Sequence, residues 1–131
     1  MVTGTPVRVI DLDGACGLET NGLDFVHVDT HVSRHDHIPE RKRKFEREKA
    51  PAMLRVIQEK PCDMIILGNN LAMGLIVAAF IPEDVRSLVV VVSFKPLEAE
   101  EEDAYRNLGI RRFSTRDDAP ALVRQLVEQR V

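Results

Sequence analysis

The apolar positions of the chain gather into short unbroken stretches, and the clearest of them extends from Met64 to Leu67. It follows Pro61 and stops at Gly68-Asn69-Asn70. An unbroken apolar stretch between Pro and Gly predicts a strand buried on both faces, as in the middle of a parallel sheet. Because ligands of such sheets bind at the carboxyl ends of the strands, the residues directly after this strand are the first candidates for function.

The rest of the pattern alternates strands with helices. Short apolar stretches predict further strands at Val7 to Ile10 and Leu88 to Val92. Weak alternation predicts another at Phe25 to Val28, and we expect a last, shorter strand at Arg112 to Thr115. Apolar residues at helical spacing predict helices at Pro39 to Lys60, Leu71 to Phe80, Pro96 to Leu108 and Asp117 to Arg130, the first of them kinked or divided at Pro51. This alternation predicts a three-layer α/β/α fold with a five-stranded parallel sheet, in a single domain over residues 1–131.

Composition is that of an ordinary globular protein. Apolar residues make up 44% and charged residues 30% of the 131 residues, and no apolar stretch is long enough to span a membrane. Met1 to Pro6 show neither the basic nor the apolar region of a signal peptide, so we expect a cytoplasmic protein. Cys16 and Cys62 stand in unrelated contexts, which favours reduced thiols over a disulfide. The net charge of -3 makes a nucleic-acid partner unlikely on charge alone.

Two groups of residues could bind metal. Asp11 and Asp13 follow the first predicted strand, where two carboxylates could hold a divalent cation or simply initiate a turn before Gly14. All four histidines lie between His27 and His37, and His27, Asp29 and His31 would share one side of an extended strand, with His35 and His37 closing a zinc-type site from the loop. Their spacing matches no common zinc motif, and polar residues after a strand also commonly form a solvated loop. Both interpretations stay open.

The first half of the helix predicted from Pro39 is strongly basic. Arg41 to Lys44 are followed by Arg47 and Lys49. Because Glu40, Glu46 and Glu48 are interleaved with them, we expect a solvated, salt-bridged face rather than a phosphate site.

Residues 61–128, with the first strand, resemble the receiver domain of bacterial response regulators. Asp63 to Leu67 is similar to the third strand of that family, Val89 to Ser93 to its fourth, and Leu108 to Phe113 to the approach to its fifth. The resemblance implies a flavodoxin-like strand order. It also implies magnesium-binding acids at Asp11 and Asp13, a hydroxyl residue at Ser93 and an aromatic residue at Phe113.

The departures from that family concern its chemistry. The phosphoacceptor aspartate of receivers falls on Gly68, which has no side chain, and the neighbouring Asn69 is an amide. The lysine of the family falls on Arg116. Without a carboxylate nucleophile, aspartyl-phosphate chemistry is lost. The chain is therefore interpreted as a pseudo-receiver, a non-enzymatic protein-binding module in signalling or regulation that is not phosphorylated and needs no cofactor.

The same resemblance implies a binding face made of the fourth helix, fifth strand and fifth helix. This face would bring the acidic residues Glu98 to Asp103 close to Arg111, Arg112, Phe113, Arg116 and Arg124. Mixed charge of this kind suits a self-complementary homodimer, although these residues also fit an ordinary solvated surface. The sequence does not identify another protein partner.

A rival interpretation begins at Val9-Ile10-Asp11-Leu12-Asp13-Gly14, which is similar to the first motif of haloacid-dehalogenase-like phosphatases. That resemblance implies Asp11 as nucleophile and Asp13 as general acid, with magnesium between them. Ser93 and the Asp117-Asp118 pair would then take the remaining roles. A third interpretation is an anion site at Gly68-Asn69-Asn70, beside the start of the next helix.

Overall fold

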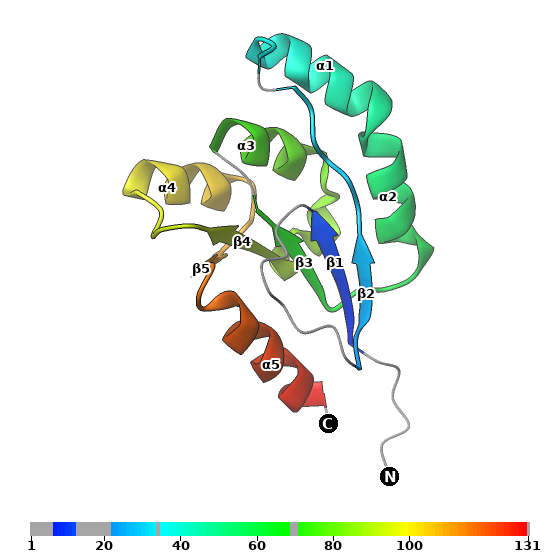
Figure 1. The fold of residues 1–131 in the computed structure, drawn as a ribbon, viewed down its shortest axis with the longest axis vertical. Helices are drawn as coiled ribbons and strands as arrows, with labels where there is room; N and C mark the ends of the chain where they lie inside the picture. The colour runs from blue at the N-terminus through cyan, green and yellow to red at the C-terminus, as the bar shows by residue number, and fades with distance from the viewer. Residues whose placement is uncertain (1–6, 13–21, 34, 69–70, 131) are drawn as a thin grey trace.

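A twisted parallel sheet forms the centre of the computed structural model, which describes residues 7–12, 22–33, 35–68 and 71–130 (Figure 1). Its strands are β1 (Arg8–Leu12), β2 (Asp24–His27), β3 (Met64–Leu67), β4 (Val89–Ser93) and β5 (Arg112–Thr115). The α-helices are α1 (Ile38–Glu48), α2 (Ala50–Glu59), α3 (Leu71–Phe80), α4 (Ala99–Asn107) and α5 (Ala119–Arg130), and a 3₁₀ helix η1 (Glu83–Leu88) precedes β4.

The strand order is β2-β1-β3-β4-β5, and every neighbouring pair is parallel. This confirms the predicted α/β fold with a five-stranded, receiver-like sheet. The central strand β3 is buried along its whole length, as its unbroken apolar sequence predicts. At the two edges of the sheet, β2 and β5 are only partly buried. The carboxyl ends of all the strands meet along one side of the sheet, which is where a site is expected.

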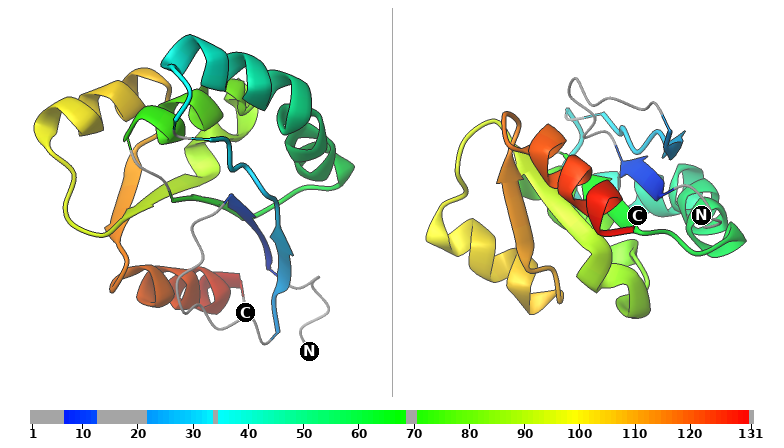
Figure 2. Two further views of the ribbon diagram at one scale, coloured as in Figure 1. Left: turned by 45° about the horizontal axis from the view of Figure 1, so that its top comes forward. Right: turned by 90° about the horizontal axis from the view of Figure 1, so that it is seen from below.

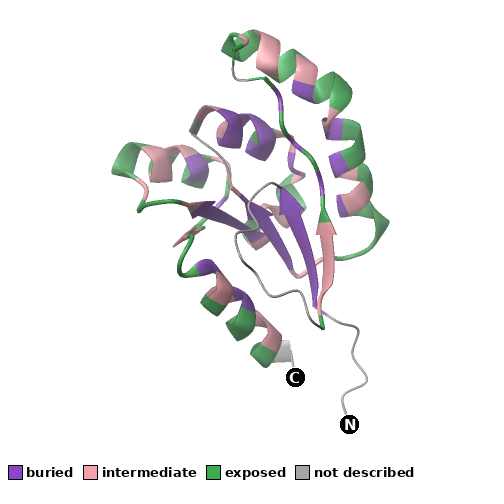
Figure 3. Cartoon of the chain, viewed as in Figure 1, coloured by how far each residue is buried: buried purple, intermediate pink, exposed green. Residues whose placement is uncertain are grey.

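Helices cover the two faces of the sheet unequally. Figure 2 shows α1 to α4 over one face and α5 over the other. On the first face, Ile65 and Leu67 of β3 pack with Phe45 of α1 and Met53 of α2. On the second face, Met64 and Ile66 of the same strand pack with Ala119 and Val123 of α5. Figure 3 shows the resulting layer of buried strand residues between half-exposed helices.

The long helix predicted over Pro39 to Lys60 is two helices, and the break lies at Lys49 rather than at Pro51. Pro51 is in the first turn of α2, where a backbone N–H has no partner within the helix. The proline therefore starts the second helix instead of interrupting it.

Other boundaries moved by a few residues. The first strand extends to Leu12, beyond the predicted end at Ile10, so Asp11 lies within the sheet. The predicted helix beginning at Pro96 starts at Ala99 instead, because Phe94 to Glu98 form a connection without helical structure. Among the described residues, no helix has the length and apolar character needed to cross a membrane.

Candidate functional site

The best-defined polar contact at the carboxyl side of the sheet joins Asp11 to His27. Asp11 of β1 lies directly opposite His27 of β2 in the parallel register. Nδ1 of His27 is 2.7 Å from Oδ2 of Asp11. The Asp11 side chain is only 2% exposed, whereas that of His27 is 55% exposed. The exposed imidazole thus provides a hydrogen-bond partner to the buried Asp11 carboxylate from the solvent side. Asp13 lies outside the described residues.

The next position along this edge carries no functional side chain. Gly68 follows β3, and its N–H points to the carbonyl oxygen of Leu12 at 3.4 Å. Because β3 lies between β1 and β4, Gly68 is at the middle of the carboxyl edge. The neighbouring Asn69 lies outside the described residues. Gly68 therefore offers backbone groups at the middle of this edge but no carboxylate, thiol or hydroxyl.

The far end of the edge is formed by Ser93, the last residue of β4, and by the segment after β5. The Ser93 hydroxyl donates a hydrogen bond to the carbonyl oxygen of Lys95, and its own carbonyl accepts from the Arg116 amide at 2.8 Å. The guanidinium of Arg116 lies over the ring of Phe94, 4.1 Å from its centroid. Phe94 is 81% exposed. The arginine is therefore held at the surface in a cation–π contact.

The histidine segment is extended, and its exposure alternates as predicted. His27, Asp29 and His31 are exposed, whereas Val28, Thr30 and Val32 are buried. Asp29 accepts a hydrogen bond from Nζ of Lys49 at 2.8 Å, and this contact lowers the pKa of the Asp29 carboxyl. The exposed His35 and His37 lie further along, before α1. In the part of the chain that the structure describes, no three His, Cys, Asp or Glu side chains are grouped so as to hold a metal ion.

A magnesium ion of the receiver type does not fit the residues that are described. The Asp11 carboxylate is buried and hydrogen-bonded to His27, and Gly68 supplies no second carboxylate. Hard cations need several oxygen ligands, and one engaged carboxylate is a poor start for such a site.

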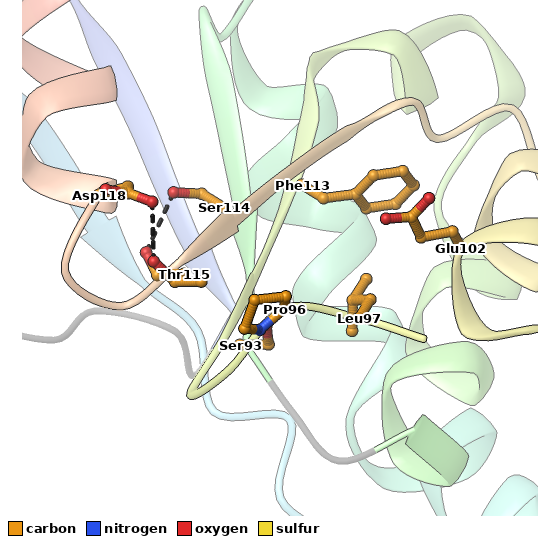
Figure 4. A pocket seen from close by; sticks show the side chains of 8 residues that line it. All are labelled: Ser93, Pro96, Leu97, Glu102, Phe113, Ser114, Thr115 and Asp118. Atoms are coloured by element: carbon orange, nitrogen blue, oxygen red, sulfur yellow. Dashed lines mark hydrogen bonds between the residues drawn. The ribbon is translucent and has the colours of Figure 1, made fainter. Parts of the chain in front are cut away.

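The face formed by α4, β5 and α5 is hollowed along the edge strand. A pocket of about 180 Å³ extends from Ser93, Pro96 and Leu97 to Glu102 of α4 and across β5 to Asp118, and Figure 4 shows the side chains that line it. A second hollow on the α5 side shares Phe113, Ser114 and Asp118 with it. We refer to these two hollows along the edge strand β5 together as the groove over β5.

The charged groups around this groove are mixed. Arg106 pairs with Glu102 at 3.4 Å, and its guanidinium lies over the Phe113 ring. Arg111, Arg112, Arg116 and Arg124 are exposed. Both signs of charge are thus exposed on α4, β5, α5 and the residues next to β5.

The basic half of α1 is neutralised locally. Arg43 pairs with Glu40, Lys44 with Asp36 at 2.7 Å, and Lys49 with Asp29. These ion pairs agree with the predicted solvated face. Cys62 is a half-buried free thiol, and burial raises its pKa; Cys16 lies outside the described residues.

Sequence reasoning missed two polar contacts of β1. Asp11 and His27 were each assigned to possible metal sites, and pairing the register of the first two strands would have brought them together. Arg8 was given no role, yet it is 4% exposed and donates to the carbonyl oxygens of Val56 and Lys60 at the end of α2. A lone arginine in an apolar strand was the available signal.

Comparison with known proteins identifies the fold of the chain but not its family. No family model matches the chain, and no curated protein matches it. Among solved structures, a match covers 96% of this chain and 97% of the other, with a TM-score of 0.56 and 18% sequence identity. That structure is HP1043, described as an orphan response regulator of H. pylori. At this identity the likeness establishes a receiver-like fold.

Proposed function

We propose that this protein is a pseudo-receiver, a non-catalytic module of cytoplasmic signalling or regulation that acts by binding another protein and is not phosphorylated. The observation that carries the proposal is Gly68 at the carboxyl end of the central strand β3. In the receiver family that this chain resembles, the phosphoacceptor aspartate stands at this position. Phosphoryl transfer to a carboxylate cannot occur where there is no side chain.

The surroundings of Gly68 support the same function. Asp11 is engaged by His27 instead of facing an open crest, and Arg116 packs on Phe94 at the surface. A receiver uses an acid and a lysine at these places to respond to the phosphoryl group. Here each of these positions has a contact that needs no phosphoryl group.

Binding is assigned to the face of α4, β5 and α5, and the preferred partner is a second copy of the chain. Glu100 and Asp103 of α4 are exposed, and so are Arg111 and Arg112 at the approach to and start of β5. In a twofold dimer, the same surface patch is used by both copies, so a patch carrying both signs of charge can complement itself. The groove over β5 supplies an apolar floor at Phe113.

The test is native mass spectrometry of the purified protein after incubation with magnesium and acetyl phosphate. The pseudo-receiver should show no adduct of a phosphoryl group. A receiver domain with an intact phosphoacceptor, treated in parallel, provides the positive control. Gly68→Asp supplies a matched variant, because it restores a carboxylate at the position in question without altering another residue.

Each outcome has a distinct meaning. An unmodified wild-type protein supports the proposal, and an adduct that appears only on Gly68→Asp supports the assignment of that position as well. An adduct on the wild-type protein that Asp11→Asn removes would overturn the proposal in favour of a phosphatase-like nucleophile at Asp11. An adduct on the wild-type protein that persists in Asp11→Asn would also overturn the proposal, because another residue would then accept the phosphoryl group.

A further inference from the structure

The pairing of Asp11 with His27 carries a consequence beyond the binding face. We propose that the His27 imidazole replaces a divalent cation as the partner of Asp11, and that the Asp11 carboxylate is thereby closed to metal. The inference concerns a different part of the molecule from the groove over β5. It holds or fails independently of the proposed partner.

The backbone fixes the two side chains against each other. Asp11 and His27 are register partners on neighbouring parallel strands, whose backbones lie about 4.8 Å apart. The amide of the next residue, Val28, donates to the carbonyl oxygen of Asp11 at 2.9 Å, so the pairing extends beyond the last residue of β2. The backbone of His27 is therefore held beside that of Asp11. The strand register thus brings the two side chains within reach of the 2.7 Å contact.

The chemistry of the pair explains why an imidazole can do the work of a cation. An ionised carboxylate only accepts hydrogen bonds, and an imidazole with its proton on Nδ1 supplies the matching donor. A buried carboxylate without a partner carries a large desolvation cost, which the donor offsets. The His27 ring remains half-exposed, so it links the buried oxygen to solvent. A metal at Asp11 would have to displace this donor.

The end of the neighbouring strand β3 provides no side-chain ligand that would favour a metal over the hydrogen bond from His27. Gly68 stands beside the end of β1, where its amide points to the Leu12 carbonyl, and it has no oxygen-bearing side chain. His27 could ligate a metal through its second nitrogen, but no third His, Cys, Asp or Glu joins this pair among the described residues. The arrangement therefore favours the hydrogen bond over a metal.

The experiment uses Mn²⁺ as the probe and NMR of the ¹⁵N-labelled full chain as the readout, since Mn²⁺ prefers oxygen ligands and broadens the signals of nearby amides. Wild-type protein is compared with His27→Ala, His27→Gln and His27→Asn. Asparagine can place an amide N–H close to the position of Nδ1, whereas glutamine approximates the other ring nitrogen. His31→Ala is the control, because His31 is exposed on the same side of the same extended segment.

In the wild-type protein, millimolar Mn²⁺ should leave the amides of Ile10 to Leu12 and of Gly68 no broader than those of β5. The same amides should broaden in His27→Ala and His27→Gln at Mn²⁺ concentrations at least tenfold lower. Wild-type behaviour should persist in His27→Asn and His31→Ala. Adding Asp11→Asn to His27→Ala should remove the gained site.

Two results would overturn the proposal. The first is selective broadening at Ile10 to Leu12 in the wild-type protein that Asp11→Asn abolishes, because the carboxylate would then bind metal in the presence of His27. The second is a folded His27→Ala or His27→Gln protein with no gain in broadening, because His27 would then not be what excludes the metal. If neither variant folds, the wild-type and Asp11→Asn spectra alone still decide the first result.

Discussion

Tyr105 is the largest of the fully buried side chains, and it fixes α4 to the sheet. Its ring packs against Phe113 of β5 with a centroid distance of 6.3 Å. Burial, assisted by the nearby Glu101 carboxylate, raises the pKa of the phenol from 10 to about 12. The buried ring thus favours the neutral form because a phenolate there would lose its hydration.

This shift predicts a loss of stability at alkaline pH. Between pH 10 and 12, the unfolded chain releases the Tyr105 proton while the folded chain retains it, so the free energy of unfolding falls as pH rises, by about 2 kcal/mol across that window. Tyr105→Phe lacks the proton and should show a shallower decline. Urea unfolding of both proteins at pH 8, 10 and 11.5 measures the difference. Parallel pH profiles would contradict the predicted contribution of Tyr105.

At this scale, the sequence predicted which residue types matter but not which atoms meet. Val28, Thr30 and Val32 alternate with exposed residues as an extended segment requires, and this was predictable from spacing. The contact of Asp11 with His27 depends on how two strands are aligned, which one strand's sequence does not specify. The role of Arg8 depends on where the far end of α2 returns to the sheet.

Helix α4 ends in a motif that the sequence marks with a single glycine. Gly109 has a φ of +89°, its N–H donates to the Arg106 carbonyl at 2.9 Å, and the N–H of Ile110 donates to the Tyr105 carbonyl at 3.1 Å. These two bonds form a Schellman motif, which satisfies carbonyl groups that the last turn would leave unpaired. The turn directs the chain into Ile110, which is fully buried, and then into β5.

Gly109→Ala should therefore lower the stability of the protein by about 1 kcal/mol, because a residue with a Cβ is disfavoured at positive φ. Space is not the cause, since the nearest atom to an added Cβ is Cβ of Arg86 at 3.8 Å. Gly109→Asn should cost less, because asparagine tolerates this conformation better. Thermal unfolding of the three proteins tests this order. Equal losses for alanine and asparagine would point to crowding instead.

Element boundaries were predictable where punctuation and periodicity agree. The bounds of α3 and β5 match the prediction, because Gly-Asn-Asn and Pro82 bracket the helix and Gly109 and Asp117 lie on either side of the strand. At α2, Pro51 led to a predicted break at the wrong residue, since a proline can either interrupt a helix or begin one. Only the packing of Phe45 and Met53 onto the sheet, with Lys49 between the two helices, distinguishes these cases.

For the molecule as a whole, the alternation of strands and helices was sufficient to predict the sheet, and the resemblance was sufficient to predict its order. The expectation of a functional site at the carboxyl edge stays a prediction. The chemistry of this edge was less predictable, because Asp11 lies inside the strand instead of after it. Because β1 ends two residues later than predicted, Asp11 is a buried, hydrogen-bonded residue of the sheet and not an exposed candidate metal ligand.

The distribution of charge over the face of α4, β5 and α5 leads to a prediction about assembly. Arg111→Glu combined with Arg112→Glu should convert a dimer to a monomer, because like charges would then meet across the twofold axis. The same result is expected for Glu100→Arg combined with Asp103→Arg. A change of equal size at Lys42 and Arg55, which are exposed on α1 and α2, should leave the dimer intact. Sedimentation velocity at several protein concentrations measures the assembly state.

Mixing the two interface variants makes this test specific. In the mixed pair, each reversed patch faces an oppositely reversed patch, so both sets of contacts regain attraction and a heterodimer should form where neither variant self-associates. Raising the salt from 0.1 M to 1 M shortens the screening length from about 10 Å to about 3 Å and should weaken the wild-type dimer. A wild-type protein that sediments as a monomer at all concentrations would exclude a second copy as the partner. If dimers persist in both charge-reversed variants, the interface lies on another face of the molecule.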